Sequence, residues 1–345
     1  MQTFFLISLF IFGLLFGSFS SVIIYRIKSG EGGIMTGRSH CGSCNKLLQA
    51  IDLIPLFSWV FNLGKCRQCK AKVSGLYPIL ELSTGALFAL IGYFLIDYNL
   101  ILLTDLGEIT KLFFWLLIGF ISIIYIFYDI LFLEISERVL ATGVGIALVG
   151  IIIQSYSEIN IFLSLPSGIT GDLLSLNHSV GLLIITIIGL YVIILKNLSE
   201  IWDTIILISL FILLYLFKIL FTDNFSLTQF PAISAIIGAL SIFTFFFIQI
   251  VISGGKWMGG GDLRIAILVG LILGSSLIFP GMMLTYFVGS IIGILFLIYQ
   301  RIKNKGEKKE LETQIPFGPF IAIGFFLAVF FQEEILEFMN VYLLV

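Results

Sequence analysis

The chain has 345 residues, of which 59% are hydrophobic and only 12% are charged, with a formal net charge of -2. A soluble domain carries about a quarter charged residues, so this composition excludes a protein whose whole surface faces water. Apolar runs of about 18 residues or more recur along the chain and predict membrane-spanning helices. The alternating strands of an outer-membrane barrel are not found in this sequence.

The first apolar run covers residues 3–25 and is uncharged throughout. It lacks the basic start and the small-residue cleavage site of a signal peptide, so we expect a retained helix. Nine further spans are predicted at residues 79–97, 112–132, 138–154, 179–195, 202–221, 233–252, 264–279, 281–299 and 316–343. The predicted fold class is all-α: a polytopic membrane protein of about ten transmembrane helices.

Positive charges predict the orientation of these helices. Eight of the 19 Lys and Arg residues lie between the first two apolar runs, within residues 26–77, and five more precede the last run. Positive residues collect on the cytoplasmic side of a membrane. We therefore expect residues 26–77 inside and, by alternation over ten helices, both chain ends outside.

The same pattern predicts the domains. Residues 1–25 form the first helix, residues 26–77 a small cytoplasmic module, and residues 78–345 the main membrane domain. Within residues 78–345, the segment 155–232 has polar connectors and is predicted to form an added helical hairpin.

All four cysteines lie in the small module, as two pairs with 21 residues between them. The pairs are Cys41-Gly-Ser-Cys44 and Cys66-Arg-Gln-Cys69. Two such knuckles supply four thiolates to one tetrahedral Zn²⁺, and a cytoplasmic location favours reduced thiols. Two redox pairs, or thiols without metal, are the alternative. Because four protein ligands close the shell, the predicted zinc site is structural.

Two acidic residues stand out in the membrane domain, since a carboxylate within a span is costly and marks a functional site. Asp129 lies near the end of the third predicted helix, and Asp262 follows the run Gly259-Gly260-Gly261. Taken singly, Asp262 could be a helix N-cap and Asp129 an interfacial charge. Taken together, two carboxylates that share one proton form an acid–base pair that can hydrolyse a peptide bond.

Short motifs in a fixed order run from the first predicted helix to the last. They are Gly17-Ser18-Phe19, Tyr25-Arg26, Arg38-Ser39-His40-Cys41, Asp52 through Trp59, Tyr77-Pro78-Ile79-Leu80-Glu81, Gly259-Gly260-Gly261-Asp262 and Ile315-Pro316-Phe317-Gly318-Pro319. This set resembles the bacterial type IV prepilin peptidases, which are intramembrane aspartic peptidases with a GxGD motif. The resemblance implies that Asp129 and Asp262 are the catalytic pair. It also implies cleavage of a basic leader from type IV prepilins or pseudopilins, after a glycine, at the cytoplasmic face of the inner membrane.

A second activity follows from the same resemblance: methylation of the new N-terminus with S-adenosylmethionine. The family associates a glycine–basic pair before the third cysteine with this activity, and here the pair is Gly64-Lys65. A simple knuckle turn is the alternative for these two residues. Asp52 and Glu81 are acidic and lie on the predicted cytoplasmic side. They either position the basic leader or form ion pairs with nearby Lys and Arg.

Three positions in two motifs depart from the family pattern. Ser136-Glu137 stand where the family usually has Pro-Asp, and Arg264 stands where the motif around Gly259, Gly261 and Asp262 usually ends in Lys. Arg keeps the charge but not the compact ammonium group. We expect these changes to affect substrate register or the tuning of the carboxylates, and not to remove either carboxylate.

The leading hypothesis is therefore a prepilin leader peptidase with N-methyltransferase activity, bound to Zn²⁺ and S-adenosylmethionine and embedded in the lipid bilayer. A peptidase without methyltransferase activity is the second hypothesis. A cation-coupled transporter, which could also use paired carboxylates, and an inactive scaffold are hypotheses of other classes. No nucleic-acid partner is expected.

Overall fold

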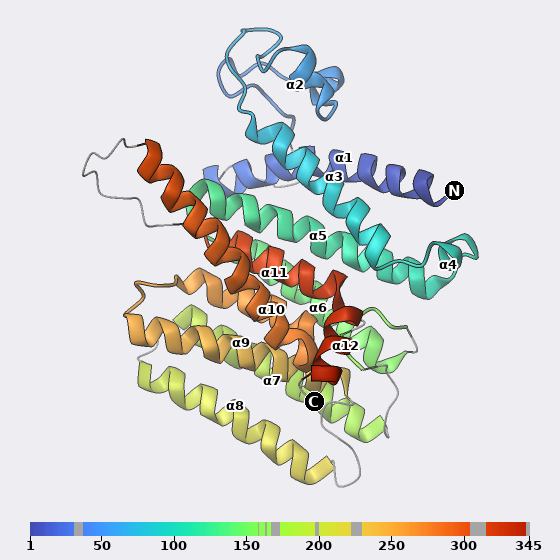
Figure 1. Cartoon of the computed structure of the whole chain (residues 1–345), viewed down its shortest axis with the longest axis vertical. Coiled ribbons are helices and arrows are strands. Elements are labelled where there is room, and N and C mark those ends of the chain that lie inside the picture. The colour runs from blue at the N-terminus through green and yellow to red at the C-terminus, as the bar shows by residue number, and fades with distance from the viewer. Residues whose placement is uncertain are drawn as a thin grey trace. The chain divides into compact units, whose positions relative to one another are not determined.

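The computed structural model describes residues 1–30, 37–157, 159–162, 164–166, 173–196, 200–221, 230–303 and 315–342. Over these residues the regular structure is helical, and the only β pairing is two isolated bridges. The chain divides into two compact units, Met1–Phe132 and Leu133–Val345. Both units are built from helices (Figure 1).

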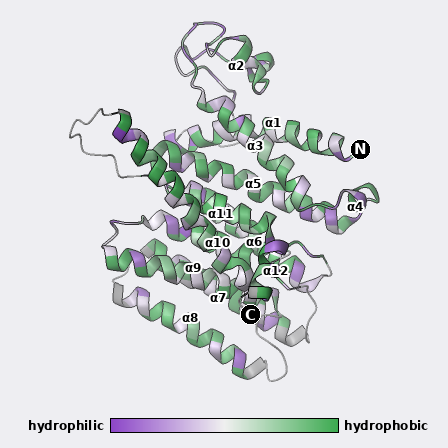
Figure 2. Ribbon diagram, in the orientation of Figure 1, coloured by the Kyte–Doolittle hydropathy of each residue, from purple (hydrophilic) through white to green (hydrophobic). Residues whose placement is uncertain are grey.

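The first unit contains three long apolar helices and the cysteine module. The long helices are α1 (Gln2–Ser29), α3 (Leu76–Phe94) and α5 (Leu106–Phe132). The module between α1 and α3 carries the short helices η1 (Ala50–Leu53) and α2 (Phe57–Phe61), and α4 (Tyr98–Leu102) connects α3 with α5 (Figure 1). The helices are hydrophobic over most of their length (Figure 2).

Helices α1 and α3 approach so closely that glycine is required at the contact. A Cβ atom on Gly17 would overlap the Cα atom of Glu81, and one on Gly13 would overlap the Cα atom of Gly85. Small residues four apart allow helix backbones to approach in this way. The pairing also shows that α3 runs antiparallel to α1. The Gly17 motif and the Glu81 motif, which are far apart in sequence, therefore meet in the structure.

Helix α5 runs parallel to α1. The rings of Phe16 and Phe120 meet edge to face with centroids 5.2 Å apart, and Lys28 Nζ lies 4.9 Å from the centroid of Phe132. Asp129 stands one turn before Phe132, so it lies at the end of the three-helix bundle from which the cysteine module projects. Within this unit, the carboxylate and the module share one end of the bundle.

Replacing Gly17 by Leu is expected to lower the free energy of unfolding by about 2 kcal/mol or more, because an overpacked contact must push α1 and α3 apart. Thermal unfolding of the purified protein in detergent measures this change. Gly145→Leu is the matched control, since nothing lies within 4 Å of a Cβ at Gly145. Equal melting temperatures for the two variants would show that the α1–α3 contact is not tight.

The second unit contains the remaining helices. They are α6 (Glu137–Tyr156), α7 (Leu173–Lys196), α8 (Glu200–Phe221), α9 (Pro231–Ser253), α10 (Gly260–Lys303), α11 (Gly318–Phe330) and α12 (Gln332–Tyr342). Helix α9 packs along α10, and α7 and α8 lie side by side as a hairpin (Figure 1).

Helix α10 is broken at Gly274, whose φ of 60° and ψ of -165° are not helical. Before the break, Gly238 of α9 packs on Gly270; after it, the Gln249 side chain bonds to the Tyr286 hydroxyl at 2.9 Å. Ser234 lies at the turning point beside Ser275. The two arms of α10 thus run in opposite directions along α9. An unbroken helix of 44 residues would be about 66 Å long, more than twice the thickness of a hydrocarbon core.

The segment after α6 holds this break in place. The Ser164 hydroxyl donates to the carbonyl of Ile272, and the Ser276 hydroxyl donates to the carbonyl of Ser164, each at 2.7 Å. The buried Gln154 amide in turn donates to the carbonyl of Phe162 and accepts its N–H. The break in α10 is therefore anchored on both sides by side-chain hydrogen bonds.

Eight described helices are long and apolar enough to cross a membrane, or nine if the bent pair α11–α12 counts as one span. The ten predicted spans differ from this count because residues 264–279 and 281–299 form the two arms of α10. We predicted their boundary at Pro280, which is wrong: the break is at Gly274, where glycine can take the positive φ. The last predicted span, 316–343, bends by 76° between α11 and α12.

Candidate functional site

Each pair of cysteines is held in the same kind of short hairpin. In the first, the Cys41 N–H donates to the carbonyl of Lys46, and Asn45 has a φ of 55°. In the second, the Cys66 N–H donates to the carbonyl of Ala71, and Lys70 has a φ of 60°. A left-handed residue thus closes both turns, so the two CxxC motifs present their thiols in equivalent ways.

The two hairpins bring the four sulfurs together. The Sγ atoms of Cys41, Cys44, Cys66 and Cys69 all lie within 4.8 Å of one another, with Cys41 and Cys69 at 3.9 Å. In a tetrahedral zinc–thiolate site with Zn–S bonds of about 2.3 Å, neighbouring sulfurs are about 3.8 Å apart. The tetrad therefore fits a single metal ion such as Zn²⁺.

The pKa values of the thiols also favour a bound cation at the tetrad. Hydrogen bonds from the backbone N–H groups of Ser43 and Cys44 lower the pKa of Cys41 to about 6. At Cys69, the Ala71 N–H acts in the same direction, but it is outweighed by desolvation and by the other three thiols, which raise the pKa to about 11. Four neighbouring sulfurs cannot all be thiolates without a balancing positive charge, which a divalent metal supplies.

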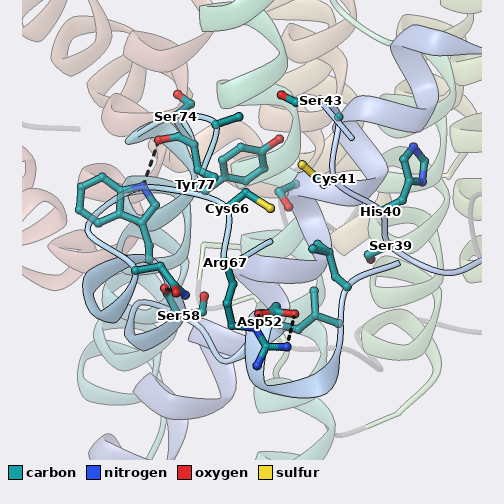
Figure 3. Close-up of a pocket in the computed structure, with 18 of the residues that line it drawn as sticks. Ser39, His40, Cys41, Ser43, Asp52, Ser58, Cys66, Arg67, Ser74 and Tyr77 are labelled. Carbon is teal, nitrogen blue, oxygen red and sulfur yellow. Dashed lines mark hydrogen bonds and ion pairs between the residues drawn. The ribbon is translucent and has the colours of Figure 1, made fainter. Parts of the chain in front are cut away.

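A cavity of about 440 Å³ lies against this tetrad, inside the first unit (Figure 3). Its walls come from the end of α1, both cysteine hairpins, the η1–α2 segment and the start of α3. Asp52 and Arg67 face it as an ion pair, and Tyr77 lies near Cys41 and Cys66 (Figure 3).

Gly64 and Lys65 lie beside this cavity. Lys65 lines it, whereas Gly64 lies behind Trp59, another lining residue. Gly64 has a φ of 67°, and a Cβ there would come within 3.0 Å of the Trp59 indole. The indole N–H donates to the carbonyl of Val73 at 3.2 Å. The glycine is thus required both by its turn and by the aromatic ring packed on it.

Asp52 and Glu81 line the same cavity with different partners. Asp52 pairs with Arg67 Nε at 3.0 Å and accepts the backbone N–H of Gln49, which links η1 to the second cysteine hairpin. The buried Glu81 accepts the backbone N–H of Leu56 at 2.7 Å, so it ties the start of α2 to α3. The ion-pair alternative thus describes Asp52, whereas Glu81 binds a backbone group.

Asp129 and Asp262 are both buried, with 6% of each residue exposed. Asp129 belongs to the first unit, in the last turns of α5, and Asp262 belongs to the second, in the first turn of α10. Their pairing remains a prediction.

The turn at Asp262 is tightly organised. The Asp262 carboxylate accepts the N–H of Gly259 at 3.2 Å, and the Asp262 N–H donates to the carbonyl of Gly259 at 3.1 Å. The bond from the Gly259 N–H to the Asp262 carboxylate is the acidic half of a capping box, in which Asp262 is the third residue of the helix and not the N-cap. Gly259 has no side chain to supply the other half, so its backbone carbonyl accepts the Asp262 N–H instead. One carboxylate oxygen is used by the cap. A Cβ on Gly261 would overlap the side chain of Ile135, so this glycine is needed for close packing.

The start of α6 is joined to the same turn. Arg264 donates to the Glu137 carboxylate at 2.5 Å. Together with the Gly261–Ile135 contact, this ion pair fixes residues 135–137 against the first turn of α10.

The chain is also similar to known proteins. Residues 11–95 match the family model of the bacterial peptidase A24 N-terminal domain. A prepilin leader peptidase/N-methyltransferase of Aeromonas salmonicida is 23% identical over 94% of this chain and 90% of its own length. Proteins of the same name from Klebsiella pneumoniae and Bacillus subtilis are 41% and 43% identical over 25% and 24% of the chain, which is 40% and 34% of their own lengths. No solved structure matches.

The chain is therefore similar to prepilin leader peptidase/N-methyltransferases over almost its whole length, and residues 11–95 match the N-terminal domain of bacterial A24 peptidases. Two of its three departures from the prepilin peptidase pattern, Glu137 and Arg264, are the partners of the ion pair between α6 and α10. Glu137 is longer than the Asp that the family usually has, and Arg264 is longer than the usual Lys and ends in a forked guanidinium group. Because these two side chains contact each other, the two changes affect one interaction and not two. Neither residue's partner could be deduced from sequence, because 127 positions separate them.

A double-mutant cycle tests this coupling. Glu137→Gln and Arg264→Gln are each expected to lower the free energy of unfolding. The loss in the double variant is expected to be smaller than the sum of the two single losses. We expect this difference to be about 0.3–1 kcal/mol, because Glu137 is half exposed. Unfolding in detergent measures all four proteins. Arg264→Gln combined with Glu108→Gln, which removes the Glu108–Lys111 pair of α5, is the control and should be additive. Additivity in the first cycle would contradict the coupling.

Sequence reasoning missed two residues, Trp59 and Ile135, as parts of a site. Trp59 belonged to a recognised motif, but its contact with Gly64 depends on a positive φ at that glycine. Ile135 lies in a connecting segment with no recognisable motif. Its side chain packs on Gly261, in the space that a side chain at that position would occupy.

Proposed function

We propose that this protein is a prepilin leader peptidase that also methylates the N-terminus it creates. The observation that carries the proposal is the match to prepilin leader peptidase/N-methyltransferases over almost the whole chain. The proposed substrates are type IV prepilins or pseudopilins, cleaved after a glycine that ends their basic leader. The cation-coupled transporter receives no support from these relatives.

In this proposal, Asp129 and Asp262 act as one acid–base pair. Both side chains are buried, and Asp129 is followed within a few residues by Ile135, which packs on the turn of Asp262. The Gly259 N–H orients the Asp262 carboxylate. Gly259 and Gly260 are exposed and carry no side chains, which leaves the backbone open there to an extended peptide.

The chemistry follows from one shared proton. Two neighbouring carboxylates do not both ionise easily, so one is charged and the other protonated. The charged carboxylate takes a proton from a water molecule, whose oxygen forms a bond to the carbonyl carbon of the scissile peptide. The protonated carboxylate donates to the carbonyl oxygen. The carboxylate that took the water proton then gives it to the leaving nitrogen as the C–N bond breaks, and the other carboxylate takes its proton back from the former carbonyl oxygen. These transfers release the leader and a new N-terminus.

The four cysteines hold Zn²⁺ as a structural ion in this proposal. The sulfur spacing fits a closed tetrahedral shell, and such a shell leaves no position for substrate. The hairpins position Arg67 and Lys65, which line the cavity next to α3. The metal thereby supports the walls of the cavity and takes no part in cleavage.

S-adenosylmethionine supplies the methyl group, and the residues around the cavity fit such a molecule in size and chemistry. The module and both carboxylates are placed on the cytoplasmic side of a bacterial inner membrane in this proposal, because Lys and Arg concentrate in residues 26–77. A basic leader synthesised in the cytoplasm reaches them there without crossing the membrane.

The test is a cleavage assay with the full-length protein in membranes and a type IV prepilin as substrate. Mass spectrometry of the product N-terminus is expected to show loss of the leader plus the mass of one methyl group. Cleavage without the added mass would support the peptidase activity and contradict the methyltransferase activity. No cleavage of prepilins or pseudopilins, by protein that is intact in the membrane, would contradict the proposal.

A further inference from the structure

We propose that the Tyr286 hydroxyl is a further hydrogen-bond donor of the peptidase site, with Gln249 as the residue that positions it. The hydroxyl donates to the carbonyl oxygen of the peptide bond that is cleaved beside Asp262. This inference deepens the proposed peptidase activity and rests on it. Tyr286 and Gln249 lie outside the recognised motifs, and the two-carboxylate mechanism leaves both of them without a role.

The fold brings Tyr286 and Asp262 to a similar level of the second unit. Helix α10 reverses its direction at Gly274, and both of its arms pack along α9 (Figure 1). Asp262 and Tyr286 are equally far from this break along the chain, one on each arm. Antiparallel arms therefore place them near the same end of α9. Asp262 is close enough that its negative charge acts on the Tyr286 phenol.

Gln249 holds the hydroxyl through its side-chain amide. The Gln249 Nε2 atom lies 2.9 Å from the Tyr286 hydroxyl oxygen, and the Oε1 atom lies 3.1 Å from it. A phenol has one hydrogen to donate, and its oxygen can also accept a hydrogen bond. When the amide donates through Nε2, the O–H group is therefore available for another acceptor. The amide carries no charge, so it orients the hydroxyl without taking its proton.

Aromatic packing fixes the ring that carries this hydroxyl. Phe245 of α9 meets the Tyr286 ring edge to face, with centroids 5.9 Å apart, and the Phe317 ring lies 5.7 Å away. Phe317 belongs to the last recognised motif, residues 315–319, and also packs on Phe246 of α9. Tyr286 nevertheless remains half-buried, so packing leaves part of its side chain open to a substrate. A donor held in this way is pre-organised.

A fixed donor beside Asp262 has a defined use in peptide hydrolysis. Negative charge develops on the carbonyl oxygen as water attacks, and a pre-oriented hydrogen-bond donor stabilises it. In the proposed mechanism the protonated carboxylate lends its proton to the same oxygen. The Tyr286 hydroxyl keeps its own proton throughout, so no bond at the phenol forms or breaks. Because this hydrogen bond is stronger in the transition state than in the ground state, its loss lowers kcat and not the binding of substrate.

A purely structural role for the two residues is the alternative, because the Gln249–Tyr286 bond also ties α9 to the second arm of α10. In that role, removal of either partner breaks the same bond and lowers the melting temperature. The folded protein would then cleave with an unchanged kcat. The two roles are therefore separated by kinetics and not by stability.

Steady-state cleavage of a type IV prepilin by the full-length protein in detergent measures kcat and KM separately. Tyr286→Phe keeps the ring and is expected to lower kcat about 10²-fold, the effect of losing one donor to a developing oxyanion, with KM nearly unchanged. Gln249→Leu is expected to lower kcat about tenfold alone and to have no further effect in Tyr286→Phe, because Gln249 acts through the hydroxyl. Methylation of a substrate that has already been cleaved should stay at the wild-type rate.

Tyr156→Phe is the matched control. The Tyr156 hydroxyl also donates to a side-chain amide, that of Asn177, but it lies at the opposite end of α6 from Glu137 and the turn of Asp262. This variant is expected to cleave like wild type, and melting temperatures in the same detergent show that each variant is folded.

Three results would overturn the inference. They are a wild-type kcat in Tyr286→Phe, a change in KM alone, and a loss in Gln249→Leu that persists in full when the hydroxyl is already absent. Failure of the wild-type protein to cleave prepilins is a different outcome, since it would contradict the peptidase activity on which the inference rests.

Discussion

Asp129→Asn and Asp262→Asn are each expected to lower the rate of prepilin cleavage by about 10²–10⁴-fold, the contribution of a positioned acid or base. An amide cannot take a proton from water or give one to the leaving nitrogen. The loss is expected to be similar for the two variants, since neither carboxylate works without the other. Time courses of leader removal in membranes, normalised to the amount of enzyme, measure the effect.

The structure makes these substitutions informative because they are mild. Asn at position 262 keeps a side-chain oxygen that can accept the Gly259 N–H, so the turn before α10 is retained. Glu134→Gln, which removes a neighbouring negative charge after α5, is the control and should cleave at the wild-type rate. Both Asn variants should still methylate a substrate that has already been cleaved. Normal cleavage by either Asn variant would show that the two carboxylates are not the catalytic pair.

The sequence was sufficient for features that depend on composition and local spacing. Span length is set by the bilayer, so hydrophobic runs located α1, α3, α5 and α9 to within several residues. The CxxC spacing likewise located the four sulfurs that the structure brings together. Each of these patterns lies within a short stretch of chain and reflects one physical requirement: the thickness of the bilayer for the apolar runs, and the geometry of metal coordination for the cysteines.

Features that depend on a partner far away in sequence were not predictable in this way. The break in α10 is at Gly274 and not at Pro280, because Ser164 and Ser276 stabilise the chain there through tertiary hydrogen bonds. Gly17 reads as one more small residue in an apolar run until α3 is packed on it. Glu137 and Arg264 likewise look like separate substitutions until the fold joins them.

The candidate site shows the same division. Gly64 and Lys65 were recognised by resemblance, but their physical role comes from Trp59, whose ring occupies the space that a side chain at Gly64 would need. A positive φ is a property of the folded turn and leaves no trace in composition except the glycine itself. Resemblance could therefore indicate the residues, whereas the contact that explains one of them required the structure.

Removal of the proposed zinc ion is the second change with a large expected effect. A chelator, or Cys66→Ser at the buried thiol, is expected to release the zinc and unfold the cysteine module, because structural zinc sites contribute roughly 10–16 kcal/mol to folding in small domains. Limited proteolysis should then cut within residues 37–75, while α1, α3 and α5 remain protected in the detergent micelle. Metal content by mass spectrometry reports the release directly.

The same experiment separates the two alternatives for the cysteines. Ser43→Ala, within the first knuckle but outside the tetrad, is the control and should retain zinc. If the pairs were disulfides, a reductant and not a chelator would open the module, and the intact mass would be lower by about two hydrogens for each bond. Resistance of the module to chelation, together with that mass difference, would contradict a metal site. Because the module forms the walls of the cavity, zinc release is also expected to abolish binding of S-adenosylhomocysteine in the proposed enzyme.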